Sequence, residues 1–246
     1  MSDSKYNQSV TADGSSRVTI GAMNQGTGEI PASDRPAPRS ATPILFVASD
    51  PNSRDRLRLD LEVKAVEEAL RSAGQEDLLA LEQDWATTFL DLQYALLRHR
   101  PKLIHFSGHG TPSGELALER DPQVPSDRRR LEPSDQRPAE AVARMLGAID
   151  GLVLKCVVLN ACFSEIQAVE VAKHADCVVG LFAEIHDSAA IEFARGFYGA
   201  LAWGQSVQAA FDLGVAQVKS QSDASLYRLI APKTDPRMVK LLEPVR

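Results

Sequence analysis

Two residues of the 246-residue chain combine the types and the positions that nucleophilic catalysis requires: His109, in the segment SGHG, and Cys162, in NACFS. A cysteine thiolate is a strong nucleophile, and a nearby histidine can protonate the leaving amine when an acyl-enzyme forms. The glycines beside His109 leave room for a substrate backbone. The N–H groups of Gly110 and Cys162 are candidate donors to the developing oxyanion. These residues predict a His–Cys dyad for acyl transfer.

Both residues follow apolar segments of strand length that alternate with amphipathic segments of helix length. Such alternation predicts a mostly parallel sheet covered by helices on both faces, with the chemistry at the carboxyl ends of the strands. The expected strands are 43–50, 77–85, 102–110, 153–164 and 176–185, with a hairpin strand at 114–119. The expected helices are 59–74, 87–100, 137–149, 167–175, 188–203 and 206–218. His109 and Cys162 should therefore meet at one edge of the sheet.

The remaining cysteines and histidines suggest no second site. Cys156 and Cys177 lie inside apolar strands and are interpreted as small buried hydrophobes. His105 and His109 are four positions apart on a strand and its loop, not on one helix face, so a zinc pair is not predicted. The other histidines are expected at the surface or at helix ends: His99, His174 and His186. We expect neither a metal nor a cofactor. The first strand lacks a following glycine-rich phosphate loop, which disfavours a flavodoxin-like nucleotide binder.

Composition restricts the partners. The net charge of −6 and the pI near 5.4 do not favour binding to nucleic acid or to an anionic membrane. No run of about 18 apolar residues and no signal peptide is evident, and three cysteines cannot form a paired disulfide framework. A cytoplasmic location is the expectation.

Two segments outside the expected sheet have a regulatory interpretation. Residues 1–42 are rich in small and polar residues and form an expected tail before a domain at 43–246. Within this tail, 16–28 is β-prone and could serve self-assembly or adaptor docking. The charged segment 119–138 is expected to be an exposed loop, either a simple surface insertion or a site for an activating protein or an upstream protease.

Three segments resemble the CHAT branch of the caspase-like (clan CD) peptidases, which is related to separase. They are HFSGHG at 105–110, VVLNACFSE at 157–165 and the long segment 178–211, and the resemblance covers about 43–232. The order His then Cys, 53 positions apart, also resembles caspases, although NACFSE departs from the animal caspase motif. The resemblance implies a caspase-like three-layer α/β sandwich and an endopeptidase that acts on protein substrates.

The resemblance also implies where the substrate residue before the scissile bond binds. That pocket is expected near the ends of the first strand and of the strand after the nucleophile, where Asp50 and Asp187 stand, with Glu184 close by. Carboxylates there would favour Arg or Lys, whereas animal caspases use arginines to hold Asp. Asp187 could instead cap the following helix.

By association with the family, the chain is expected to be a regulated signalling or antiviral-defence effector. The alternative is a catalytically silent caspase-like module that serves as a scaffold.

Overall fold

The computed structural model describes residues 41–51, 57–75, 77–123 and 134–242. The chain divides into the units Met1–Pro38 and Arg39–Arg246, and every described residue belongs to the second. The expected tail up to residue 40, with its 16–28 segment, lies outside the described residues. So does the middle of the 119–138 segment.

A six-stranded sheet in the order β2-β1-β3-β6-β7-β8 forms the centre of the fold. The first five strands in this order are parallel, and β8 is antiparallel to β7. Their bounds are β1 (Thr42–Ser49), β2 (Leu79–Trp85), β3 (Leu103–Gly108), β6 (Leu154–Asn160), β7 (Ala175–Leu181) and β8 (Tyr227–Ile230). The predicted caspase-like α/β sandwich with a mostly parallel sheet is confirmed. The edge strand β8 was not predicted.

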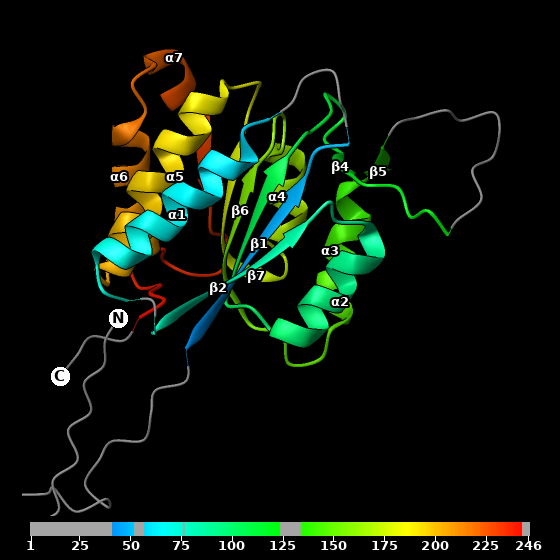
Figure 1. Cartoon of the computed structure of the whole chain (residues 1–246), viewed down its shortest axis with the longest axis horizontal. Helices are drawn as coiled ribbons and strands as arrows, with labels where there is room; N and C mark the ends of the chain where they lie inside the picture. The colour runs from blue at the N-terminus through cyan, green and yellow to red at the C-terminus, as the bar shows by residue number, and fades with distance from the viewer. Residues whose placement is uncertain (1–40, 52–56, 76, 124–133, 243–246) are drawn as a thin grey trace, which may run out of the picture. The chain divides into compact units, whose positions relative to one another are not determined.

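Helices cover both faces of this sheet (Figure 1). One layer contains α1 (Leu59–Ser72), α5 (Asp187–Ala202) and α6 (Val207–Gln217), and the short α7 (Gln221–Ala224) follows α6. The other layer contains α2 (Phe89–His99), α3 (Ala139–Ala148) and α4 (Glu165–Val171). Alternate residues of each strand face opposite layers. In β1, Phe46 packs in the α1–α5 core, whereas Leu45 and Val47 pack in the α2–α3 core.

The segment after β3 differs from its prediction. The expected hairpin strand is β4 (Leu116–Leu118), and it pairs antiparallel with β5 (Asp135–Arg137), which belonged to the expected loop 119–138. Arg137 is fixed there because it pairs with Asp135 and lies over the Phe89 ring, 4.2 Å from its centroid. The polar sequence of β5 concealed this pairing.

Among the described helices, none combines enough length with enough apolar character to cross a bilayer.

Candidate active site

The strands β3 and β6 bring the two predicted catalytic residues to the same edge of the sheet. These neighbouring strands pair in register, with Ser107 opposite Asn160. His109 and Cys162 each stand two positions after a member of that pair. Both lie outside the strands, because β3 and β6 end earlier than their apolar sequences suggest. The structure therefore places both residues in adjacent turns, where their side chains are free of the sheet.

Gly110 packs closely against the turn that carries Cys162. A Cβ atom added to Gly110 would lie 1.8 Å from the carbonyl oxygen of Cys162, so no other residue fits without moving that backbone. Gly110 forms an isolated bridge with Leu116, flanked by hydrogen bonds of 3.0 Å that join residues 109 to 117 and 111 to 115. In such a non-hydrogen-bonded pair, the N–H of Gly110 points away from β4. This geometry is compatible with the predicted oxyanion role.

The turn that carries Cys162 is held in place by its own backbone conformation and by the hydrogen bonds of Ser164. Phe163 adopts a positive φ of 55°, which allows the chain to reverse between β6 and α4. Ser164 is buried; its Oγ donates to the carbonyl of Leu159 and accepts from the N–H of Leu181, each at 2.9 Å. The two bonds tie the turn to the ends of β6 and β7. The position of the Cys162 backbone is thus fixed by the sheet.

Burial raises the pKa of the Cys162 thiol. A hydrogen bond from the backbone of Ile185 opposes this effect, while the carboxylates of Glu184 and Asp187 add to it. The thiol is therefore protonated near neutral pH in this structure. Burial raises the pKa of Cys156 far above its ordinary value and that of Cys177 to about 12, and both are fully buried, as expected for core residues.

Asp50, predicted to line the substrate pocket, pairs with His109 in this structure. Its Oδ1 lies 3.0 Å from His109 Nε2, and its Oδ2 accepts from the N–H of Leu57 at 3.3 Å. The side chains of Asp50 and His109 are 20% and 24% exposed. With Nε2 engaged, Nδ1 has no hydrogen-bond partner among the described residues. A carboxylate in this position orients the imidazole and stabilises its cation.

Asp187 and Cys162 line the same small cavity, which has a volume of about 40 Å³. Asp187 is the first residue of α5, after the N-cap His186, and its Oδ2 accepts from the backbone N–H of Arg58 at 3.1 Å. Asp50 is not among the lining residues of this cavity. The two carboxylates predicted for one pocket thus occupy different positions, one on the histidine and one beside the thiol.

A buried polar network, three of whose members line this cavity, was missed by the sequence reasoning. Glu62 of α1 accepts hydrogen bonds from His105, Ser107 and Asn160, and the Tyr198 hydroxyl bonds His105 from the other side. Glu62 follows Leu59 by three positions, on the core-facing side of its helix, and an acidic residue at such a position was a signal that could have revealed it. His105 is therefore held by a carboxylate and a phenol. The described residues contain no group of three His, Cys, Asp or Glu side chains arranged to hold a metal ion.

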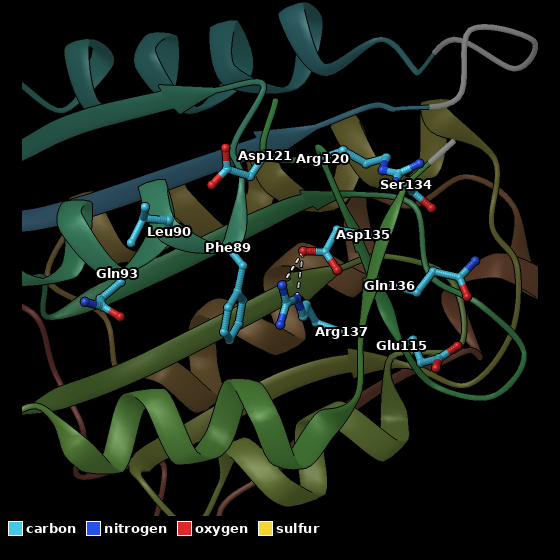
Figure 2. A pocket seen from close by; sticks show the side chains of 10 residues that line it. All are labelled: Phe89, Leu90, Gln93, Glu115, Arg120, Asp121, Ser134, Asp135, Gln136 and Arg137. Carbon is cyan, nitrogen blue, oxygen red and sulfur yellow. Dashed lines mark hydrogen bonds and ion pairs between the residues drawn. The ribbon is translucent and has the colours of Figure 1, made fainter. Parts of the chain in front are cut away.

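A larger groove of about 420 Å³ lies between the start of α2 and the β4–β5 hairpin (Figure 2). Figure 2 shows Arg137 beside Asp135, with the Phe89 ring next to its guanidinium. Described residues from both ends of the 119–138 segment line this groove, among them Asp121 and Ser134. It shares no lining residue with the Cys162 cavity.

The covered parallel sheet, with its two chemically capable residues at the carboxyl edge, defines a caspase-like α/β protein. The chain belongs to the CHAT domain family, whose model matches residues 17–228. The match begins before residue 43, where the resemblance was expected to start.

The chain is also similar to several proteins that are named as proteases. A "Probable protease" of Gillisia limnaea is 26% identical over 159 residues, which are 65% of this chain and 27% of that protein, so the chain spans about a quarter of this relative. Among solved structures, the Arg-specific cysteine proteinase gingipain R has a TM-score of 0.53 at 10% identity, over 82% of this chain and 50% of that chain. Caspase-1 of Spodoptera frugiperda has a TM-score of 0.48 at 10% identity, over 80% and 91%.

Proposed function

We propose that the chain is a cysteine endopeptidase in which Cys162 is the nucleophile and His109 the acid–base partner. The observation that carries the proposal is the register of β3 and β6. It places both residues two positions past one strand pair, with the Gly110 backbone packed against Cys162.

The reaction follows from the roles of these groups. His109 removes the thiol proton, and the Cys162 sulfur attacks the carbonyl carbon of the scissile bond. The N–H groups of Gly110 and Cys162 stabilise the oxyanion of the tetrahedral intermediate. The imidazolium, stabilised by Asp50, then protonates the leaving amine, and a thioester remains. Water hydrolyses the thioester with His109 as base, which restores the thiol.

The proposed cleavage site follows a basic residue. Asp187 lines the cavity beside the nucleophile, and a carboxylate there attracts the cationic end of Arg or Lys. Arg58 also lines this cavity, but its guanidinium donates two hydrogen bonds of 3.0 Å to Asp60, which offset its charge. The protein substrates, the intracellular signalling or antiviral role and control through 119–138 are parts of the same proposal.

The decisive experiment compares the wild type with Cys162→Ala in a proteome-wide cleavage profile. We expect new N-termini that follow Arg or Lys in the wild type and none in the variant. Cys177→Ala, which removes a buried thiol, is the matched control and should retain the profile. A wild type that produces no cleavage and is not labelled by a thiol-reactive peptide would instead support the silent scaffold.

A separate assay addresses the 119–138 segment. Wild-type protein incubated alone or with a trypsin-like protease should be nicked between 119 and 138, and its activity should rise after the cut. An intact segment, or a nick with no change in rate, would contradict a role of this segment in activation.

A further inference from the structure

The cavity beside Cys162 contains a second carboxylate in addition to Asp187. Glu62 lines it from α1 and is only 3% exposed, whereas Asp187 is half-buried and Arg58 is exposed. By exposure, Glu62 lies at the inner end of the cavity and Asp187 nearer the solvent. A buried charge interacts more strongly than an exposed one because water screens it less.

The hydrogen bonds around Glu62 indicate that it keeps its negative charge. Tyr198 is completely buried, and within the described part of the chain its hydroxyl has one hydrogen-bond partner, His105 Nδ1 at 3.0 Å. The other ring nitrogen of His105, Nε2, lies 2.7 Å from Glu62 Oε1. Hydrogen bonds from His105, Ser107 and Asn160 to a carboxylate favour its ionised form.

The pKa of Glu62 agrees with this charge. Burial alone would raise it, but the electrostatic effect of His105 and the hydrogen bonds from His105, Ser107 and Asn160 outweigh burial. The pKa therefore lies below its ordinary value, and the carboxylate is ionised at neutral pH.

Among the described residues, the network leaves one acceptor position of Glu62 open. A carboxylate offers about four lone-pair positions. Oε1 accepts from His105 at 2.7 Å and from Asn160 at 2.5 Å, and Oε2 accepts from Ser107 at 2.5 Å. One position on Oε2 is left, on a side chain that lines the cavity.

We propose that Glu62 is a specificity-determining residue that receives the cationic end of the substrate side chain at the inner end of the cavity, with Asp187 nearer the entrance. This inference rests on the proposed function and adds the residue that binds the positive charge of the substrate side chain. The cavity of about 40 Å³ holds about one water molecule. A long substrate side chain must therefore displace apolar lining residues, among them Ile185, to reach Glu62.

The test compares two peptides that differ only before the scissile bond, one with arginine and one with citrulline, its neutral isostere. For each enzyme we measure the ratio of kcat/KM for the two peptides, which does not depend on the fraction of folded protein. We expect Glu62→Gln to lower this ratio about 10- to 100-fold, the effect of losing one charge-assisted hydrogen bond. Glu68→Gln, on the same helix but exposed and paired with Lys64, is the matched control and should keep the wild-type ratio.

Glu62→Asp keeps the test decisive if the glutamine variant does not fold. It retains the charge but withdraws it by one methylene, so the preference should shift from arginine towards the longer homoarginine. A purely structural role would reduce all rates together and leave both ratios unchanged, which would overturn the inference. A wild type that cleaves peptides with equal kcat/KM for arginine and citrulline would overturn this inference but not the peptidase. A wild type that cleaves no peptide and resists thiol labelling would overturn both.

Discussion

The pairing of Asp50 with His109 predicts how a single charge change should affect catalysis. Asp50→Asn keeps the shape of the side chain but removes the carboxylate 3.0 Å from Nε2. A hydrogen bond to a charged group contributes about 1.5–3 kcal/mol. Because both side chains are about one-fifth exposed, we expect the lower part of that range. A loss of about 1.5–2 kcal/mol corresponds to a decrease of about 10- to 30-fold in kcat/KM.

The assay uses the same arginine and citrulline peptides, because they separate the two roles considered for Asp50. If Asp50 acts through His109, the substitution lowers kcat/KM for both peptides by the same factor. If Asp50 instead binds the charged side chain of the substrate, as the sequence predicted, only kcat/KM for the arginine peptide decreases. Asp212→Asn, on the exposed surface of α6, is the control and should change neither rate. Rates within twofold of the wild type would refute the orienting role derived from the structure.

Three further predictions concern the turns and the buried network. Gly110→Ala should reduce activity at least about 100-fold because its Cβ would collide with the Cys162 carbonyl. Gly199→Ala in α5 is the control, because the added Cβ has open space around it. It should leave the free energy of unfolding unchanged or raise it by up to about 1 kcal/mol in denaturant titrations. Ser164→Ala should lower the free energy of unfolding by about 1–3 kcal/mol, because a buried N–H and a buried carbonyl lose their partner, and unchanged stability would contradict this. The folded-state pKa of Glu62 lies below its ordinary 4.5, so its stabilisation is present above about pH 4.5 and is lost as pH falls through the folded pKa. Wild-type stability should therefore decrease more steeply on acidification than that of Glu62→Gln, and parallel curves would contradict the ionised state.

The architecture was predictable because its strands are apolar on both faces and its helices are amphipathic. These patterns depend on burial alone. They correctly placed the central strands, although β3 and β6 end at Gly108 and Asn160, before His109 and Cys162. The strands β5 and β8 were missed. The sequence of β5, Asp-Gln-Arg, has no apolar pattern. Arg137 of this strand pairs with Asp135 and lies over the Phe89 ring, and hydrophobic periodicity reveals neither contact.

The assignment of carboxylates could not be predicted to the same degree. The family resemblance implied a pocket near the ends of two strands, and both residues were expected in it because Asp50 and Asp187 follow those strands. Which way each side chain turns depends on the loops that hold it. The Leu57 N–H holds Asp50 beside His109, and the Arg58 N–H holds Asp187 at the start of α5. These adjacent donors belong to the segment before α1, and nothing in a periodic pattern specifies their direction.

In the proposed peptidase, the segment between β7 and α5 would link recognition of the substrate to the reactivity of the thiol. Ile185 donates a backbone hydrogen bond to Cys162 and also lines the cavity, and Asp187 lines the cavity while its charge raises the thiol pKa. A cationic side chain bound beside Asp187 offsets that charge, so the thiol pKa should be lower in the complex than in the free protein. An apolar side chain of equal length would displace Ile185 without this compensation. The charge of the substrate is therefore expected to increase the thiolate fraction at Cys162 as well as the affinity, which makes selectivity for basic residues partly a property of the chemical step.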